Sequence, residues 1–295
     1  MAKSGECIRI PDFHALTPWR TSFNPHFTEV AAASSAWALS FDIFSGPTSQ
    51  KKLEIFQKSG GALLAAYVHP TTGVDGLRTA CDFINLLYAI DELTDCQDSV
   101  ETGRTAQTVI RSVQDEAYDD ETPLSRMTKS FMKRLEPFVG TDGHARFIEH
   151  VASYMRAVVT EVAHREKGIV LEVAEYDPLR RENSAVPCCL VLIGCVLGPR
   201  MDLPDIVFED PAFQRMHIAA VDMISWSNDV YSYKRESEMG HVTNNVLTVL
   251  RRNSTMYLQQ AVDQAGVHYR ELYEAFEAAR AQLPSYGAEL DIIVA

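Results

Sequence analysis

The sequence lacks the features that would place it in a membrane, on nucleic acid or in an oxidising compartment. Its most apolar run, Val186 to Leu197, is too short to cross a bilayer, and Met1–Pro11 has no apolar core of a signal peptide. Acidic residues outnumber basic ones by 40 to 27, and a net charge of −13 disfavours nucleic acid or anionic membranes as partners. None of the six cysteines forms a CxxC pair, so we expect reduced, mostly buried thiols. These absences predict a soluble, cytoplasmic protein.

Clear strand patterns, internal repeats, low-complexity tracts and linkers are also lacking. Apolar residues instead recur at helical spacing along most of the chain. We therefore expect a single all-α domain over residues 1–295, with residues 1–25 as an extended arm. The predicted helices cover residues 26–45, 51–67, 76–95, 98–118, 123–138, 143–167, 184–198, 210–236, 242–264 and 267–282.

One predicted helix differs from the others because it is apolar on every side. A helix of the type seen at Ser184–Leu197 is usually buried in the middle of a bundle. Pro187 lies near its start and would disrupt a helix continuing from Glu172. We expect a break between Asn183 and Pro187 that leaves backbone carbonyls without intrahelical partners.

A stretch near residue 230 places three oxygen-bearing side chains at steps of four. Asn228, Ser232 and Glu236 would share one face of a helix. Amide, hydroxyl and carboxylate oxygens are ligands that Mg²⁺ accepts, and the cation of Arg235 beside them suits a phosphate. The alternative is a surface helix with a hydrogen bond between the serine and the glutamate.

A second acidic feature ends the predicted helix 76–95. Its apolar stripe of Leu77, Cys81, Ile84 and Leu87 or Tyr88 continues into Asp91 and Asp95. A carboxylate on a buried face, at the helix end where the dipole disfavours anions, needs a compensating ion such as a divalent metal. The alternative is a frayed, solvated acidic helix end.

Together, these features resemble the two metal motifs of class I terpene synthases, and the similarity is greatest to mushroom-type sesquiterpene synthases. The resemblance rests on Asp91-Glu92-x-x-Asp95, on Asn228-Asp229-x-x-Ser232-x-x-Arg235-Glu236, and on the arginines Arg180-Arg181 before the broken apolar helix. It covers nearly the whole chain, and the motifs occur in the family's order.

The resemblance implies an α-helical bundle with a central apolar pocket and three Mg²⁺ ions, with Mn²⁺ as an alternative ion. It implies that Asp91 ligates two ions, with Asp95 or Glu92 in a supporting role, and that Asn228, Ser232 and Glu236 ligate the third. It further implies that the diphosphate of farnesyl diphosphate accepts hydrogen bonds from Arg181 and Arg235, with Arg180 as an alternative sensor. The protein is expected to act as a monomer or a homodimer.

Ionisation of such a substrate leaves an allylic cation, which an apolar pocket shields from water and aromatic faces stabilise. Tyr88 is the best-placed candidate ring because it shares the stripe with Asp91, and Phe83, Trp226 and Tyr67 are alternatives. Each of these rings is more often ordinary core packing than a partner of a cation. The break at Ser184 and Ala185 resembles the family's effector position, where a carbonyl dipole meets the reacting allyl group.

The sequence departs from the family pattern at two places. The first motif is DExxD instead of DDxxD, which is an ordinary variant in mushroom enzymes. The Arg-Tyr pair that the family carries on a C-terminal capping helix does not occur in the 67 residues after Asn228. We expect a truncated C-terminus and a lower turnover than in a version that has the helix.

The predicted function is Mg²⁺-dependent cyclisation of farnesyl diphosphate to a sesquiterpene hydrocarbon or alcohol. A catalytically silent relative that binds prenyl diphosphates is an alternative, supported by the short C-terminus. A chain-elongating prenyltransferase is a further alternative, but its second aspartate-rich motif is lacking near Asp229.

Overall fold

The computed structural model describes residues 7–43, 49–196, 203–252 and 254–294. These residues form helices and no strand, which confirms the predicted all-α fold. The α-helices are α1 Phe13–Leu16, α2 Phe27–Leu39, α3 Ser49–Lys58, α4 Gly61–Val68, α5 Val74–Thr94, α6 Ser99–Gln114, α7 Pro123–Leu135, α8 Thr141–Glu166, α9 Val173–Asn183, α10 Val186–Val196, α11 Asp205–Glu209, α12 Pro211–Met239, α13 Val246–Arg251, α14 Leu258–Arg280 and α15 Ala288–Val294, and a 3₁₀ turn η1 covers Val242–Asn244.

Two of the predicted helix boundaries were wrong for reasons that involve glycine. The helix predicted over 51–67 is two helices, because Gly60 adopts a left-handed backbone conformation with φ of 73° between α3 and α4. The helices predicted over 242–264 and 267–282 are instead the short α13 and the long α14, which passes through Gly266. A Cβ at Gly266 would lie 2.7 Å from Cγ of Pro11, so the lack of a side chain here allows the N-terminal arm to pack closely against α14. The glycine does not end the helix. The helix predicted over 26–45 ends earlier, at Leu39, and Asp42 beyond it has a left-handed φ of 53°. The predicted ends at 45 and at 197–198 themselves lie outside the described residues.

The described chain divides into two compact units. The first contains the residues up to Trp19, Ala163–Val186 and the residues from Asp205 onward, and the second contains Arg20–Val162 and Pro187–Pro204. The single domain expected over residues 1–295 stays a prediction, because compact units of this kind occur both within one domain and as separate domains.

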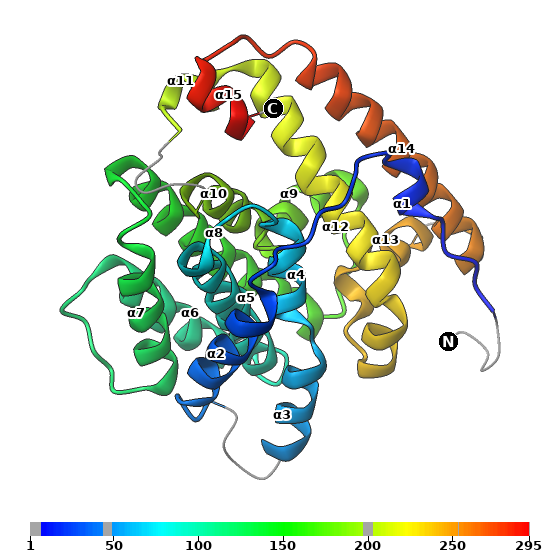
Figure 1. The fold of residues 1–295 in the computed structure, drawn as a ribbon. Coiled ribbons are helices and arrows are strands. Elements are labelled where there is room, and N and C mark those ends of the chain that lie inside the picture. Colours follow the sequence, from blue (N-terminus) through cyan, green and yellow to red (C-terminus); the bar gives the residue numbers. More distant parts are fainter. Residues whose placement is uncertain (1–6, 44–48, 197–202, 253, 295) are drawn as a thin grey trace. The chain divides into compact units, whose positions relative to one another are not determined.

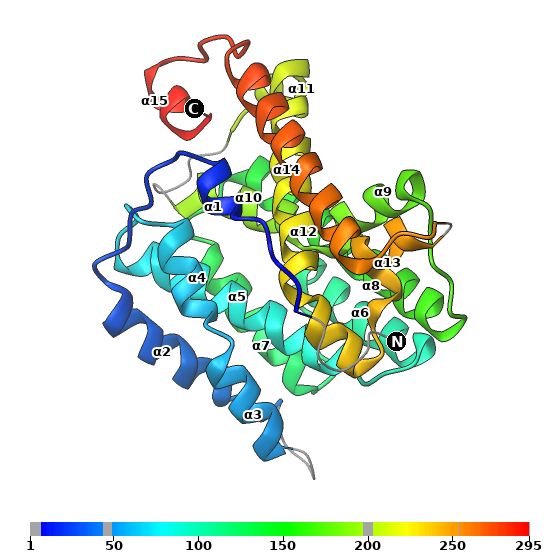
Figure 2. The same ribbon diagram turned by 90° about the vertical axis from the view of Figure 1, so that its right-hand side faces the viewer.

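In the first unit, α12 packs lengthwise against α14, as both ribbon views show (Figures 1 and 2). Its core contains Met223, Trp226 and Val230 of α12 together with apolar residues of α13 and α14. The N-terminal arm is only partly extended, since Asp12 caps the short α1. The buried ring of Phe13 packs against Tyr269 at a centroid distance of 4.7 Å, and this contact attaches the arm to α14.

In the second unit, α5 is the central helix and packs against α2, α4 and α7 (Figure 2). Small residues, Ala62, Ala65 and Ala66, form the buried face of α4 and allow it to lie close to α5. An aromatic cluster lies on another side of α5, where the rings of Phe83, Phe131 and Phe147 have centroids 5.2 to 5.7 Å apart.

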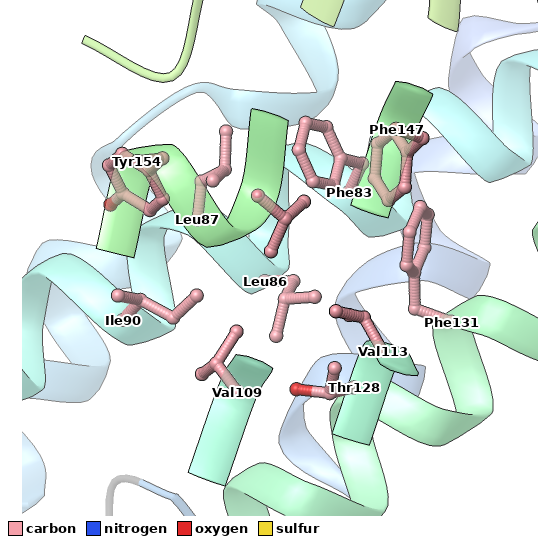
Figure 3. Close-up of a pocket in the computed structure, with 11 residues that line it drawn as sticks. Phe83, Leu86, Leu87, Ile90, Val109, Val113, Thr128, Phe131, Phe147 and Tyr154 are labelled. Atoms are coloured by element: carbon pink, nitrogen blue, oxygen red, sulfur yellow. The ribbon is translucent and has the colours of Figure 1, made fainter. Parts of the chain in front are cut away.

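Beside this cluster lies an apolar cavity lined from α5, α6, α7 and α8 (Figure 3). The space inside it that can hold the centre of a water molecule is about 10 Å³, enough for one water at most. Such a cavity cannot take a farnesyl chain. The central substrate pocket expected from the resemblance is therefore not this cavity, and it stays a prediction.

A buried ion cluster links three helices of the same unit, and sequence reasoning did not anticipate it. Asp82 on α5 is fully buried and accepts hydrogen bonds from Ser34 at 2.5 Å and from Arg78 at 2.8 Å. Arg134 of α7 lies 2.6 Å from the other carboxylate oxygen. Burial raises the pKa of Asp82, while these donors oppose the shift. The cluster fixes α2 and α7 to α5.

The described cysteines are free thiols, as expected, but fewer of them are buried than predicted. Among the five whose side chains are described, Cys81 and Cys188 are buried, Cys189 is partly exposed, and Cys7 and Cys96 are exposed. The side chain of Cys195 lies outside the described residues. None of the described helices has the length and apolar content needed to span a bilayer.

Candidate active site

Helix α12 carries the three predicted oxygen ligands of the second motif. The helix begins after Asp210, whose carboxylate accepts two backbone N–H groups at 2.7 and 3.2 Å, and it ends at Gly240, where φ is 80°. Asn228, Ser232 and Glu236 therefore follow one another at one-turn intervals within an unbroken helix. Asn228 is exposed, whereas Ser232 and Glu236 are half-buried.

The side chain of Asn228 is held by an arginine from α9. Arg180 donates from Nη2 to Oδ1 of Asn228 at 3.0 Å, and from Nε to Oδ1 of Asp229 at 2.9 Å. The side chains of Arg180 and Asp229 are only 12% and 2% exposed. Arg180 therefore has a buried carboxylate as its partner, and it orients the amide oxygen of a predicted metal ligand.

Asp229 accepts hydrogen bonds from two other segments of the first unit, α9 and the start of α13. Besides the guanidinium of Arg180, it accepts hydrogen bonds from the hydroxyl of Tyr176 on α9 and, at 2.7 Å, from the backbone N–H of Val246 at the start of α13. Burial, followed by the negative charge of Asp229, raises the pKa of Tyr176 well above its ordinary value. This carboxylate joins α9, α12 and α13.

Sequence reasoning did not single out Asp229 as more than part of the motif. A signal for it was present, because Asp222, Trp226, Asp229 and Tyr233 follow one another at steps of four, three and four. Two carboxylates on a stripe that also carries aromatic residues indicate buried ion pairs on that face of the helix.

Glu236 is oriented from outside α12 by Asn245. The side-chain nitrogen of Asn245 donates to Oε2 of Glu236 at 2.9 Å. Burial raises the pKa of Glu236, and the nearby Ser232 hydroxyl and Asn245 amide oppose this shift. The Ser232 oxygen is itself buried and makes no hydrogen bond of normal geometry within the described part of the chain.

The α12 residues fit a hard divalent cation. Mg²⁺ binds carboxylate, amide and hydroxyl oxygens, and the Ser232 hydroxyl beside the Glu236 carboxylate adds a third oxygen to this set. Among the described residues, no three His, Cys, Asp or Glu side chains form a metal-binding group. A site on α12 would therefore depend on the oxygens of Asn228 and Ser232 in addition to the carboxylate of Glu236.

Arg181, the predicted diphosphate sensor, is paired with a carboxylate that sequence reasoning did not single out. Its Nε and Nη2 donate to the two oxygens of Asp222 at 2.7 and 2.8 Å, a bidentate arrangement. The arginine side chain is 31% exposed and that of Asp222 is 7% exposed. The pair holds the plane of the guanidinium in place while leaving part of it accessible. Arg235, the other predicted donor, is exposed on α12.

The predicted break between Asn183 and Pro187 is confirmed. Helix α9 ends at Asn183 and α10 begins at Val186, because Ala185 adopts a left-handed conformation with φ of 56°. Ser184 stabilises the turn, since its hydroxyl donates to the carbonyl of Arg181 at 2.7 Å and accepts from the N–H of Val186 at 3.1 Å. A non-glycine residue at positive φ is strained, and such residues are enriched at functional sites.

The first motif lies in the second unit, at the end of α5. Asp91 occupies the last turn of this helix and Asp95 caps it, with the N–H of Asp95 bonded to the carbonyl of Asp91 at 2.9 Å. Asp95 is half-buried, but Asp91 is exposed, so the prediction that both lie on the buried face was wrong for Asp91. The buried stripe instead continues through Ala89 and Ile90.

The charge of Asp91 nevertheless affects the interior. Tyr154 of α8 is buried, and burial, followed by the negative charge of Asp91, raises its pKa well above the ordinary value. Tyr154 also lines the apolar cavity of Figure 3. Sequence reasoning missed this residue, because nothing in the local pattern of α8 relates it to α5.

Tyr88 lies one turn before Asp91 and is half-buried. Its hydroxyl donates to the carbonyl of Ser59 at 3.4 Å, and its ring edge lies about 3 Å from where a Cβ of Gly61 would be. Tyr67, the other tyrosine considered, is 52% exposed and packs edge-on against Phe23.

The two remaining candidate rings are packed in cores. Phe83 belongs to the aromatic cluster of the second unit. In the first unit, Trp226 is 4% exposed and donates from Nε1 to Asp177 at 3.1 Å, and its ring packs at a tilt against that of His268 with a centroid distance of 4.2 Å. These contacts favour a packing role for both rings.

Comparison with known proteins relates most of the chain to one family. The family model described as terpene synthase family 2, C-terminal metal binding, matches residues 82–275. Linoleate 10R-lipoxygenase COP4 of Coprinopsis cinerea and bifunctional terpene synthase Agr4 of Cyclocybe aegerita are each 35% identical over 283 residues, which is 96% of this chain and 80% and 81% of those proteins. A sesquiterpene synthase of Piloderma croceum is 33% identical over 277 residues, covering 92% of this chain and 79% of that protein.

A solved structure gives the same picture of the fold. Hedycaryol synthase in complex with HEPES has a TM-score of 0.83 and 21% sequence identity, and the match covers 98% of this chain and 93% of that one. At this identity the likeness concerns the fold alone.

Proposed function

Because this chain belongs to the terpene synthase family and is a class I enzyme of that family, we propose that it is a sesquiterpene synthase acting on farnesyl diphosphate with Mg²⁺. The reaction would release diphosphate, close one or more rings, and end in loss of a proton or capture of water. The sesquiterpene synthase of Piloderma croceum supports the choice of a fifteen-carbon substrate.

The observation that carries the proposal is the ligand set on α12. Asn228, Ser232 and Glu236 lie on successive turns, two of them are oriented by residues from outside the helix, and the buried Ser232 oxygen makes no hydrogen bond of normal geometry among the described residues. A plain surface helix would not hold an amide and a carboxylate in this way. We assign these side chains to one Mg²⁺, and Asp91 and Asp95 to two others. Bound Mg²⁺ supplies charge neutralisation of the leaving diphosphate.

The two adjacent arginines have different roles in this proposal. Arg181 uses its Nε and Nη2 on Asp222, and we propose that its remaining edge donates to the diphosphate, together with Arg235. Arg180 acts instead as a positioning residue, because its guanidinium is committed to Asp229 and Asn228. Donors fixed before the reaction stabilise the charge that develops on the leaving group without reorganising.

The remaining assigned residues concern the hydrocarbon part of the substrate. The strained turn at Ser184 and Ala185 separates α9 from α10. We propose that this turn presents a backbone carbonyl to the allyl group of the substrate as the cation forms. Tyr88 is proposed to stabilise that cation with its ring face. Apolar surroundings keep water from the cation until the last step.

The proposal is tested by incubating the purified protein with farnesyl diphosphate and Mg²⁺ and analysing the extract by gas chromatography and mass spectrometry. We expect a cyclic sesquiterpene with the native protein and none with EDTA, with Mn²⁺ tested as a replacement. Geranyl diphosphate and geranylgeranyl diphosphate serve as shorter and longer substrates. Folded protein that yields no terpene would refute the proposal.

Two serines on α12 provide a matched pair of variants. Ser232→Ala removes a proposed ligand and is expected to lower kcat/KM at least about 100-fold, because losing a ligand should cost more than losing a residue that only orients one. Ser227→Ala removes a hydroxyl that donates to the carbonyl of Ile224 at 3.1 Å, and it is expected to keep near-native activity. Equal activity of the two variants would refute the assignment of α12.

The same assay separates the alternatives. A silent relative would bind inorganic diphosphate with Mg²⁺ and yield no product, whereas a prenyltransferase would yield a longer prenyl diphosphate when isopentenyl diphosphate is added. The similarity to a protein named as a linoleate lipoxygenase calls for one more incubation, with linoleate and oxygen, in which we expect no oxidised product.

A further inference from the structure

Asn245 lies outside the predicted motifs and occupies a central position in the first unit. It is fully buried between η1 and α13, and every polar atom of its side chain has a partner. The Nδ2 group donates to Oε2 of Glu236 and to the backbone carbonyl of Asp229, both at 2.9 Å. The Oδ1 atom accepts the N–H of Leu247 at 3.0 Å and so caps α13.

We propose that Asn245 is a positioning residue that fixes the Glu236 carboxylate for metal binding. This inference rests on the proposed function, because it takes Glu236 to be a Mg²⁺ ligand. An amide has two N–H donors and one carbonyl acceptor, and here all of them are used, so the side chain cannot rotate without losing hydrogen bonds. A carboxylate oriented by such a group has less freedom to lose when the ion binds.

The chemical type of the residue also suits this role. An amide donates without carrying charge, so it orients the carboxylate and does not repel the incoming cation as lysine or arginine would. One N–H on Oε2 leaves the carboxylate with further lone pairs for an ion. Residues that hold a metal ligand in this way commonly change the metal affinity about 10- to 100-fold when they are removed.

The competing explanation is that Asn245 only caps α13, and Asn245→Ser separates the two roles. Serine is about as good a cap as asparagine but is too short to reach Glu236, and it brings no charge. Asn245→Thr is a second neutral variant that keeps a capping hydroxyl. Asp98→Asn, at the cap of α6 in the other unit, is the matched control for a conservative change at a helix start.

The first measurement is the affinity for Mn²⁺ in the presence of inorganic diphosphate, determined by electron paramagnetic resonance. It requires no turnover. We expect Asn245→Ser and Asn245→Thr to weaken Mn²⁺ binding about 10-fold or more, and Asp98→Asn to leave it unchanged. The concentration of Mg²⁺ that gives half-maximal activity should rise by a similar factor, while kcat at saturating Mg²⁺ changes less. A drop in Tm with unchanged Mn²⁺ affinity would show a capping role alone and overturn the proposal.

A double-mutant cycle tests whether Asn245 acts through Glu236. In the Glu236→Ala background, Asn245→Ser should cause no further loss of Mn²⁺ affinity, because the group that it orients has been removed. Independent losses that multiply would overturn the proposal. If the native protein did not bind Mn²⁺ with diphosphate and did not form product, the proposed function itself would fail. This outcome differs from failure of the proposal on Asn245, in which the native protein binds Mn²⁺ and the Asn245 variants bind it equally well.

Discussion

The pairing of Arg180 with Asp229 leads to a specific stability prediction. Arg180→Met would leave the Asp229 carboxylate, which is 2% exposed, without its cation. Removing one partner of a buried ion pair typically costs about 3–5 kcal/mol. Tyr176 and the N–H of Val246 still donate to the carboxylate, so we expect a loss near the lower end, about 3 kcal/mol.

Arg181→Met is the matched comparison, because it alters the neighbouring residue of the same helix. Arg181 is 31% exposed and its partner Asp222 is 7% exposed, so water partly replaces the lost cation. We expect a smaller loss, about 1–2 kcal/mol, together with at least about a 100-fold loss in kcat/KM. Arg180→Met should therefore lower stability more than Arg181→Met does, and Arg181→Met should lower turnover more than Arg180→Met does.

Urea denaturation followed by far-ultraviolet circular dichroism measures the first quantity, and the farnesyl diphosphate assay measures the second. Asp229→Asn is the diagnostic second change, since an amide in that position needs no cation. The double variant Arg180→Met/Asp229→Asn should be more stable than the sum of the single losses implies, by about 1–3 kcal/mol. If Arg180→Met were as stable as the native protein, the reasoning that loss of the buried cation destabilises the fold by about 3 kcal/mol would be refuted.

Two further predictions concern parts of the chain away from the metal ligands. His69 is buried, which lowers its pKa from 6.5 to about 4. Between pH 6.5 and about 4, the unfolded chain protonates His69 more readily than the folded chain does, so the free energy of unfolding falls as the pH drops through this range. In urea titrations, the native protein should lose about 1.4 kcal/mol per pH unit more than the His69→Gln variant over the same range. Gly266→Ala should destabilise, because its Cβ would clash with Pro11, whereas Gly103→Ala, with open space around it in α6, should gain up to about 1 kcal/mol; the reverse order in thermal melts would contradict this account.

The sequence was sufficient for the helical class and for the placement of the three predicted ligands on one helix. Asn228, Ser232 and Glu236 occur on one helix because their spacing matches the helical period, and spacing is a local property of the chain. The turn at Ala185 was also predictable from a local property of the chain, because Pro187 constrains the backbone nearby.

The partners that hold these residues could not be predicted in this way. Asp229 and Asn245 make their contacts with residues from several segments, and helical spacing within α12 does not indicate which other helix supplies a donor. For Asp91, the error came from choosing one of two adjacent stripes on α5. The helices that pack against α5 decide which stripe is buried, and their positions depend on contacts distant in sequence.

The cavity among α5, α6, α7 and α8 could be filled by larger side chains to stabilise the protein, without substitution of the proposed metal ligands. Its lining residues belong to the second unit, whereas the residues that orient Asn228 and Glu236 belong to the first. Replacing Val109 or Val113 with isoleucine would fill part of the cavity, and changes of this kind commonly add about 0.5–2 kcal/mol. That reserve would let the enzyme tolerate destabilising substitutions that change its product, so the cavity is a natural starting point for directed evolution.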